Sequence, residues 1–439
     1  MFKAIDEAVK KFKEAEEPIR IISHLDADGI ASAAILTKAL KRENKKFSLS
    51  IVRQVSDRLI HQLSIEEYPT LVFTDLGSGN IEQIESLNKN MFILDHHQIS
   101  KETKITHINP KLFGIEQEEF SGACLTYLFV KALNEKNKDL AHLAIIGAIG
   151  DSQILNKEIL EDAKDKIEIK KGLKIFGSQT RSLHKLLEYS TDPYIPGVTG
   201  KEQNAIRFLE ELNIPLKQDN KWRKLVNLTE EETKKLVAAI IIQRLGSETN
   251  PEDIIGDNYL LKSEEDESPT KDLREFSTLL NCCGRLNKPS LGIGTCLNNK
   301  KAKEQALELL IKYKQEIING LNWFYDNKDK VLKENNLVII NAEDNIRDTM
   351  VGTINSIISN SNLYKEKTII LSMAHTLDDN TKISIRSTNN KDVNLKEILN
   401  KITKKLDYEA GGHNFAAGAL IPQEKEEEFI KLALEEFKK

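Results

Sequence analysis

Four short apolar runs between residues 20 and 95 constrain the fold of this chain most, because a polar cluster directly follows three of them. The runs occupy residues 20–24, 47–52, 71–75 and 91–95, and amphipathic helical stretches separate them. Near-continuous apolar runs of this length are typical of buried strands in parallel α/β sheets. Ligands of such sheets bind beyond the carboxyl ends of the strands. The sequence therefore predicts a parallel α/β domain with its functional site at one sheet edge.

The polar clusters contain residue types that bind metal ions. In the stretch SHLDADG, the residues His24, Asp26 and Asp28 are spaced by two, so they can line one rim after a strand. The other clusters are Asp75 in TDLG, Asp95 with His96 and His97 in LDHH, and Asp151 in IGAIGD, which we expect at a further strand end. Crowded carboxylates repel one another unless a cation neutralises them. Histidine and aspartate together suit Mn²⁺, Fe²⁺ or Zn²⁺, so the clusters predict a metal centre.

Taken singly, most of these clusters also have a purely structural explanation. Asp28 and the following glycine can form a turn and a helix N-cap, and a lone aspartate such as Asp75 at a strand end is usually a cap. The adjacent pair His96 and His97 is harder to explain by packing, because neighbouring residues point to opposite sides. The presence of four such clusters within residues 24–151 favours the metal centre.

The rest of the chain changes character twice. Residues 157–333 read as charged amphipathic helices, with a Pro/Gly-rich stretch at 191–202 and an N-cap at Thr229. A second α/β rhythm begins at Asn335, and a charged helix closes the sequence. We expect a parallel-sheet domain at 1–192, a helical connector at 193–333 and a smaller α/β domain at 334–439.

Composition limits the classes of function. The formal net charge of the 439-residue chain is −5, so any nucleic-acid contact must come from a local basic surface. The four cysteines form no CxxC pair, which fits buried thiols in a reducing cytoplasm. The first residues resemble a charged helix, not a signal peptide, and the apolar runs are too short to span a membrane. We therefore expect a cytoplasmic protein without membrane association.

The four motifs, in this order and spacing, resemble those of the DHH phosphoesterase superfamily. The stretch GGHNFAAGAL at 411–420 resembles the glycine-rich motif of its DHH-associated domain. Residues 273–297 and the helical middle section resemble the archaeal RecJ-like nucleases. That group includes the GINS-associated nucleases and is related to a subunit of the eukaryotic replicative helicase. The chain departs from bacterial RecJ in that His24, not an aspartate, begins the first motif, as in pyrophosphatase-like branches.

The resemblance implies two divalent cations, with Mn²⁺ as the expected ion and Mg²⁺ or Co²⁺ as alternatives. One ion would be held by His24, Asp26 and Asp75, and the other by Asp28, Asp75, His97 and Asp151. Asp95 would orient a histidine, and His96 would face the scissile phosphate. An intact set of motifs favours a working enzyme over a catalytically inactive relative.

Residues of the C-terminal domain would bind the substrate. Gly411 and Gly412 would let backbone N–H groups approach a phosphate, with His413 and Asn414 as further donors. Ser384 and Arg386 alternate on one strand face, and Arg386 suits a bidentate phosphate contact. The alternatives are a simple turn for the glycines and a solvated edge charge for Arg386. Arg347 and Arg285 are weaker candidates, and His61, His107, His142, His184 and His375 are expected to be structural.

We expect a metal-dependent single-strand exonuclease that releases nucleoside monophosphates from DNA or RNA in replication or repair. One alternative is a phosphodiesterase for short oligonucleotides (a nanoRNase) or cyclic dinucleotides, although a compact enzyme for small substrates needs no helical section at 157–333. The other is a replisome scaffold that binds a GINS-type partner. The sequence settles neither the polarity of digestion nor the choice between DNA and RNA.

Overall fold

The structure is a computed structural model that describes residues 1–115, 119–247, 250–361, 363–388, 393–408 and 410–438. Its packing divides the chain into two compact units, Met1–Leu310 and Ile311–Lys439, and each is described by itself. The expected domain boundaries at 192/193 and 333/334 stay predictions. Among the residues described, no helix has the length and apolar character needed to cross a membrane.

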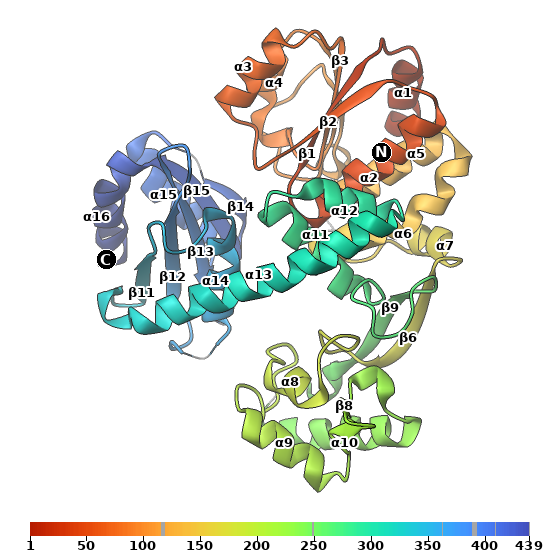
Figure 1. Ribbon diagram of the computed structural model, residues 1–439. Coiled ribbons are helices and arrows are strands. Elements are labelled where there is room, and N and C mark those ends of the chain that lie inside the picture. The colour runs from red at the N-terminus through yellow and green to blue at the C-terminus, as the bar shows by residue number, and fades with distance from the viewer. Residues whose placement is uncertain (116–118, 248–249, 362, 389–392, 409, 439) are drawn as a thin grey trace. The chain divides into compact units, whose positions relative to one another are not determined.

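The first unit contains the expected parallel sheet (Figure 1). Its strand order is β2-β1-β3-β4-β5, and every pair is parallel. The strands are β1 (Ile19–His24), β2 (Phe47–Val52), β3 (Thr70–Thr74), β4 (Asn90–Leu94) and β5 (Thr106–Ile108). The predicted α/β fold is confirmed. The expectation of a buried strand at 47–52 is wrong in one respect, because β2 lies at the sheet edge and all its residues are only half-buried.

Helices cover both faces of this sheet. On one face, α1 (Phe2–Lys13) and α5 (Gly122–Leu133) bring Phe12 and Phe129 edge to face, with ring centroids 5.2 Å apart. Phe92 of β4 meets Phe12 in the same way at 5.3 Å. Its neighbour Ile93 belongs to the apolar cluster of the opposite face, together with residues of α3 (Asp57–Ile65) and α4 (Ile81–Glu85). The alternation of side chains along β4 thus serves two separate apolar layers.

The apolar run before Asp151 is a helix, not the strand that the sequence was expected to form. Residues Ala141–Gly150 form α6, which packs against α2 (Ala27–Arg42), α5 and α11 (Leu273–Arg285). A helix with neighbours on several sides is apolar all round, and periodicity cannot distinguish such a run from a buried strand. Asp151 still reaches the sheet edge, because it follows the last turn of α6.

The middle of the chain is not purely helical, contrary to expectation. After α7 (Lys157–Ala163), the antiparallel strands β6 (Ile167–Leu173) and β9 (Ile255–Leu261) form a two-stranded ribbon. Between them lies a small helical subdomain with its own apolar core. Its elements are α8 (Leu183–Glu188), α9 (Glu202–Glu211), α10 (Glu230–Arg244) and a hairpin of β7 (Lys217–Gln218) and β8 (Lys221–Trp222). The helices α11, α12 (Pro289–Cys296) and α13 (Lys300–Asp326) follow the ribbon.

The expected N-cap at Thr229 is confirmed, and it allows a stability prediction. The Thr229 side chain accepts the N–H of Glu232, and the Glu232 carboxylate accepts the N–H of Thr229. This reciprocal capping box satisfies two N–H groups that the helix leaves unpaired. We expect Thr229→Ala to lower the free energy of unfolding by about 1 kcal/mol. Chemical denaturation would measure this, and an unchanged midpoint would contradict it.

The second unit is built on a six-stranded mixed sheet with the order β10-β11-β12-β13-β15-β14. Its elements are β10 (Leu332–Glu334), β11 (Leu337–Asn341), α14 (Asp348–Ser359), β12 (Ile369–His375), β13 (Asn380–Ser387), α15 (Leu395–Thr403), β14 (Ala410–His413), β15 (Ala416–Pro422) and α16 (Glu426–Phe437). Only β11 and β12 pair in parallel among the described strands of this sheet. The predicted second α/β region is therefore present.

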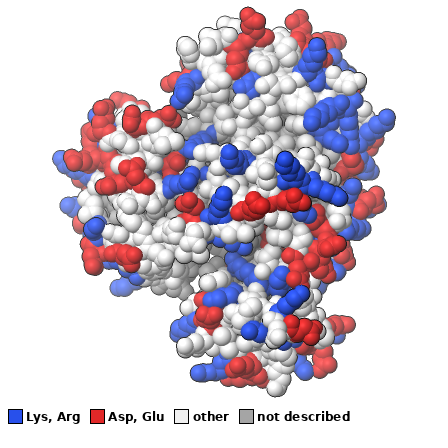
Figure 2. Space-filling view, in the orientation of Figure 1, with Lys and Arg blue, Asp and Glu red and all other residues white. Residues whose placement is uncertain are grey.

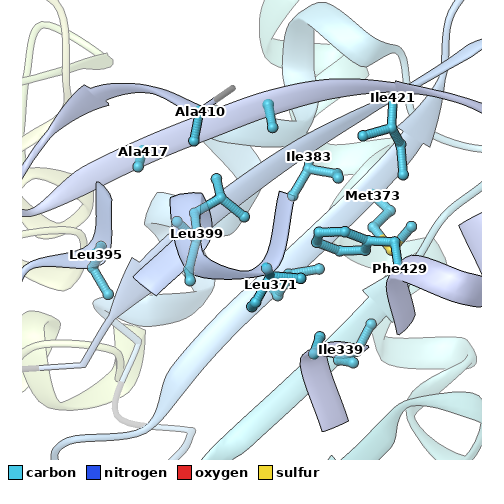
Figure 3. Close-up of a cluster of buried hydrophobic side chains, with 14 of the residues drawn as sticks. Ile339, Leu371, Met373, Ile383, Leu395, Leu399, Ala410, Ala417, Ile421 and Phe429 are labelled. Carbon is cyan, nitrogen blue, oxygen red and sulfur yellow. The ribbon is translucent and has the colours of Figure 1, made fainter. Parts of the chain in front are cut away.

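Figure 3 shows the main core of this unit. Leu371, Ile383 and Ile421 project from three strands toward Leu399 of α15 and Phe429 of α16. The intervening strand residues belong to the other face, which α14 covers over β12 and β13. That face carries Ser384, so the alternation predicted for β13 places the candidate substrate residues away from this core.

Candidate metal centre

Three neighbouring strands carry the polar clusters to one edge of the first unit's sheet. β1 ends at His24, while Asp75 and Asp95 directly follow β3 and β4. Because these strands are adjacent and parallel, their carboxyl ends meet. The backbone of Asp75 is left-handed, with φ +59°, which is uncommon for a residue other than glycine. Its N–H donates to the carbonyl of Leu94 at 2.9 Å, which fixes the turn.

The start of α2 contributes two further carboxylates. Asp26, not Asp28, is the N-cap of α2 and accepts the N–H of Gly29 at 3.0 Å, so the cap suggested for Asp28 is formed by a different residue. Asp28 is fully buried, and its two oxygens accept the N–H groups of Gly122 and Ala123 at 2.6 and 3.0 Å. These N–H groups belong to the first turn of α5, where the helix dipole also favours negative charge.

Three groups of candidate ligands share Asp75. In the first, Nδ1 of His24 lies 2.9 Å from Oδ2 of Asp26 and 3.5 Å from Oδ2 of Asp75. The second joins Asp75 with Asp28, Asp151 and a histidine, and the third joins it with Asp95, His96 and His97. Within each group, one potential ligand atom from every residue lies within 4.8 Å of the others. The spatial convergence expected from the sequence is therefore present.

The histidine of the second group is His96, and His97 belongs to the third group. Nε2 of His96 lies 3.3 Å from Asp75 and 3.2 Å from Asp151, and its side chain is only 8% exposed. His97 is 35% exposed, and its Nδ1 pairs with Asp95 at 2.7 Å. His97 also lies near Asp75, with Nδ1 4.0 Å from Oδ1, so the roles expected for the two histidines stay predictions. The two rings lie side by side, with centroids 4.4 Å apart, because the residues follow β4 and do not alternate as they would within a strand.

The Asp95 carboxylate orients both His96 and His97. Its Oδ1 accepts the backbone N–H of His96 and lies 2.7 Å from Nδ1 of His97, and its Oδ2 accepts the N–H of Ser78 at 2.8 Å. The Ser78 hydroxyl contacts His107 at 2.9 Å, and the Asn109 amide donates to both Ser78 and the carbonyl of His97. This buried network explains His107 as a structural residue, as expected, that supports the histidine pair.

Gln153 was not predicted as a site residue, although it lies two residues beyond Asp151. It contacts Nδ1 of His96 at 2.8 Å. With the amide oxygen turned toward the ring, it would accept the Nδ1 proton and leave the Nε2 lone pair for a cation.

The electrostatics of the cluster fit a cation. Burial and the charges of Asp28 and Asp26 raise the pKa of Asp75 well above its ordinary value. Burial and Asp28 raise the pKa of Asp151 to about 6. Burial lowers the pKa of His96, but contacts with Asp151 and Asp75 outweigh this and raise it well above the ordinary value. Protons on Asp75 and His96 therefore offset part of the negative charge when no cation does.

Unpaired polar atoms give a second test of fit. Both carboxylate oxygens of Asp75 are buried without a hydrogen bond from any described residue, and so are Nδ1 of His24 and Nε2 of His96. Buried polar atoms normally have partners. These atoms face one another across the two groups, and their mixed nitrogen and oxygen chemistry suits divalent manganese, iron or zinc. The residues present therefore fit divalent cations.

The raised pKa values of Asp75, Asp151 and His96 predict that cation binding depends on pH. A bound ion needs Asp75 and Asp151 ionised and His96 neutral, so binding releases protons. With the pKa of Asp151 at about 6, we expect the Mn²⁺ affinity at pH 6 to be at least about tenfold below that at pH 8. Calorimetry in two buffers of different ionisation enthalpy would count the protons. Equal affinities at both pH values would contradict the assignment.

Close backbone packing surrounds the site. An ideal Cβ on Gly122 would lie 2.5 Å from Cβ of Asp75, and one on Gly147 would lie 2.3 Å from Oδ1 of Asp28. The helix α11 reaches the loop that carries Asp26, because Oδ1 of Asn281 accepts the N–H of Ala27 at 3.1 Å. A Cβ on Gly284 would lie 1.6 Å from the Leu25 carbonyl oxygen. Asn281 and Gly284 lie in the stretch 273–297, but no local signal in it indicated this contact.

The second unit brings Ser384 and Arg386 together. The Arg386 guanidinium donates to Oγ of Ser356 at 3.0 Å and to Oγ of Ser384 at 3.3 Å. Ser356 lies on α14 and was not predicted. Arg386 is thus held by hydrogen bonds, which argues against the alternative of a solvated edge charge.

The glycine-rich motif lies on the same sheet as Ser384. Gly418 of β15 pairs with Ser384 on one side and with Gly411 of β14 on the other, so the three residues lie level across the sheet. Among the described atoms, nothing lies within 4 Å of a Cβ built on Gly411, and Gly412 has φ +111°. Asn414 is in the exposed turn that follows. The His413 side chain lies outside the described part of the structure, so its expected role stays a prediction.

Comparison with protein-family models finds three matches along the chain. Residues 18–148 match the DHH family N-terminal domain, 175–256 the DHH-CID domain and 335–439 the DHHA1 domain. A protein of Methanocaldococcus jannaschii described as uncharacterized is 32% identical over 432 residues, covering 94% of this chain and 91% of the relative. The chain belongs to the DHH superfamily. The DHH match spans the first three motifs, and Asp151 lies just beyond it.

Solved structures of low sequence identity share the fold. CDC45 of Entamoeba histolytica superposes with a TM-score of 0.65 at 11% identity, covering 100% of this chain and 99% of that one. RecJ of Thermus thermophilus, in complex with Mn²⁺, gives 0.61 at 16% identity over 99% of this chain. The chain spans about half of that RecJ, covering 54% of its length. An exonuclease RecJ bound to manganese gives 0.60 at 16% identity, covering 98% of this chain and 94% of that one. The DHH-family chain thus has a RecJ-like and CDC45-like fold.

Proposed function

We propose that this protein is a metal-dependent single-strand exonuclease that hydrolyses phosphodiester bonds and releases nucleoside monophosphates. The observation that carries the proposal is the convergence of His24, Asp26, Asp28, Asp75, His96 and Asp151 into two groups that share Asp75. A structural protein has no need to bury so many repelling carboxylates at one sheet edge. Strongly perturbed carboxyl groups of this kind are typical of functional sites.

Each group would hold one divalent cation. We assign His24, Asp26 and Asp75 to one ion, and Asp28, Asp75, His96 and Asp151 to the other. Mn²⁺ is the proposed ion because two manganese-bound RecJ structures share the fold and the donors are mixed. Bound cations would supply an activated water and positive charge for attack on phosphorus.

The remaining residues would position the phosphate and move a proton. His97 lies on the more exposed side of the cluster, and Asp95 fixes its ring through Nδ1. We therefore propose His97, in place of His96, as the group that faces the scissile phosphate and donates a hydrogen bond to it. In the second unit, Arg386, Ser384 and the backbone at Gly411 and Gly412 would bind another phosphate of the strand. His413 and Asn414 are proposed as additional donors there.

A polymeric substrate is favoured over a small one by the subdomain that matches the DHH-CID model, residues 175–256. Hydrolysis of a short oligonucleotide or cyclic dinucleotide requires only a metal centre and one phosphate site. The subdomain adds surface to the first unit beyond the metal-binding sheet, and a long strand can use such surface.

End-labelled strands test the proposal. Single-stranded DNA and RNA of about 20 nucleotides, labelled at either end, would be incubated with the full chain in Mn²⁺ and in EDTA. We expect mononucleotides in Mn²⁺ and intact strands in EDTA, and the label that is released first identifies the polarity. Hydrolysis of a dinucleotide without hydrolysis of a longer strand would favour the small-substrate alternative. No hydrolysis of either would contradict the proposal.

A scaffold function is the second candidate, because the chain also has the CDC45-like fold and a DHH-CID match. Such a protein would bind a GINS-type replisome partner without cleaving nucleic acid. The complete set of candidate ligands argues against binding as the sole role. Co-purification with a partner together with failure to bind Mn²⁺ would favour the scaffold.

A further inference from the structure

The loop between β6 and α8 presents an arginine that the metal centre does not use. The guanidinium carbon of Arg181 lies 4.9 Å from the ring centroid of Phe176 and 5.4 Å from that of Tyr189. Both distances are within the range of cation–π contacts. Gly177, with φ +97°, makes room for the arginine, since a Cβ there would lie 2.5 Å from Cδ of Arg181. The arginine is therefore held in one place by its neighbours.

The buried carboxylate of Glu275 on α11 anchors the loop that carries Arg181. Oε1 of Glu275 accepts the N–H of Gln179 at 2.9 Å, and Oε2 accepts the hydroxyl of Thr180. The N–H of Arg181 donates to the carbonyl of Gly177 at 2.9 Å. A loop fixed in this way presents its arginine at little cost in ordering entropy when a ligand binds.

The guanidinium N–H groups of Arg181 have no partner among the residues that the structure describes. Within those ranges, Arg181 makes no side-chain hydrogen bond and no ion pair, and the nearby carboxylate of Glu275 is already engaged by Gln179 and Thr180. Burial lowers the pKa of Arg181, and the charge of Glu275 offsets this only in part. A half-buried cation with unused donors is costly unless an anion binds it. The next cation, Lys185, differs because it pairs with Glu188 and Glu202.

Tyr189 adds a surface for a flat ring. Its side chain is 51% exposed, although it packs against Arg181. Figure 2 shows positive and negative side chains mixed over most of the face that it draws. An exposed aromatic ring beside an arginine is the combination that binds the base and the phosphate of a single strand.

The helix α11 contacts both the loop that carries Arg181 and the loop that carries Asp26. Glu275 anchors the loop in the first turn of α11, and Asn281 contacts the metal-binding loop six residues later. Six residues of α-helix span about 9 Å. Single-strand sites commonly cover about 4–16 nucleotides. The separation of these two contacts along α11 is therefore small compared with the length of strand that such a site covers.

We propose that Arg181 and Tyr189 form a binding site for single-stranded nucleic acid outside the metal centre, with Arg181 on a phosphate and Tyr189 stacked on a base. The inference rests on the proposed function and adds a second contact for the same strand. It assigns the subdomain that follows β6 a role in holding the polymer.

Binding and cleavage must be measured separately to test this site. Affinity of the full chain for fluorescent dT20 would be measured by anisotropy in EDTA over a range of salt concentrations. Hydrolysis of a dinucleotide in Mn²⁺ would report the metal centre alone. We expect Arg181→Ala and Tyr189→Leu each to weaken dT20 binding about tenfold and to leave dinucleotide hydrolysis unchanged. Arg181→Ala should also reduce the slope of log K against log salt by about 0.7.

Lys224→Ala is the matched control, because Lys224 pairs with Ser182, next to Arg181, in a β-bridge and its charge is already paired with Glu267. We expect this variant to keep the wild-type affinity and slope. Arg181→Lys keeps the charge but not the planar stack, so it should retain the slope and lose part of the affinity. If Arg181→Ala is poorly folded by circular dichroism, Tyr189→Leu and Arg181→Lys decide the matter.

The outcomes distinguish the two levels of the proposal. Wild-type binding of dT20 by both Arg181→Ala and Tyr189→Leu would overturn the site and leave Arg181 available to an acidic protein partner. Dinucleotide hydrolysis by a wild-type chain that does not bind dT20 would overturn the site while retaining a phosphodiesterase. Failure of the wild-type chain in both assays would overturn the proposed function itself.

Discussion

Replacement of Asp75 by asparagine is expected to abolish hydrolysis while making the metal-free protein more stable. Asp75 is 1% exposed, and burial together with Asp28 and Asp26 raises its pKa well above the ordinary value. A carboxyl group with a raised pKa in the folded state destabilises the protein at any pH where it is ionised when unfolded. Asparagine has almost the same shape and no charge. We expect a gain of about 1–2 kcal/mol in the free energy of unfolding at pH 8 in EDTA.

The same substitution removes the residue that both groups share. We expect the hydrolysis rate to fall by about 10³-fold or more, because the bound cations contribute several kcal/mol to such reactions. Asp6→Asn on the exposed face of α1 is the matched control and should change neither quantity. Urea denaturation, Mn²⁺ calorimetry and the strand assay would measure the three effects. A variant that loses stability and still hydrolyses strands would refute the role of Asp75.

Gly284→Ala is expected to disturb the metal-binding loop from a helix more than 250 residues away in sequence. The new methyl group would lie 1.6 Å from the carbonyl oxygen of Leu25, a distance that no side-chain rotation can relieve. Either α11 or the loop must move, and both carry other contacts of the site. We expect a loss of about 3 kcal/mol in the free energy of unfolding, together with weaker Mn²⁺ binding.

Gly172→Ala provides the comparison for this variant. Gly172 lies in β6, and the nearest described atom to an added Cβ is 3.7 Å away, on the Asn258 side chain. We expect this change to be close to neutral in thermal melting and in Mn²⁺ binding. If Gly284→Ala melts at the same temperature as Gly172→Ala and binds Mn²⁺ equally well, the close approach of α11 is not important.

The parts of the site that follow strands could be predicted, because a parallel sheet brings its carboxyl ends together whatever the connecting helices do. His24, Asp75 and Asp95 illustrate this. Asp151 was expected at the correct edge for the wrong reason, since α6 is buried on several sides and its sequence lacks a helical period. The choice between His96 and His97 depends on the turn after β4, which local sequence does not determine.

The contacts that Asn281, Gln153 and Ser356 make could not be predicted from the sequence for a different reason. Asn281, Gln153 and Ser356 act through single hydrogen bonds to the residues of the two sites, and nothing in their own neighbourhoods distinguishes them from other polar residues. The β6–β9 ribbon was missed because its exposed lysines, such as Lys170 and Lys171, read as a charged helical face. The elements of the second unit were easier to predict, since its strands alternate apolar and polar residues and its helices show the helical period.

The contact between α11 and the loop after β1 has a practical consequence for dividing the chain into fragments. A fragment ending near residue 192 would retain every candidate cation ligand but lose Asn281 and Gly284. The N–H of Ala27 and the surface at Leu25 would then be left to solvent, on the very segment that carries two of the carboxylates. Expression of the isolated N-terminal sheet is therefore expected to give a protein with an intact set of motifs and a poorly ordered cation pocket, and truncations intended for biochemistry should retain α11.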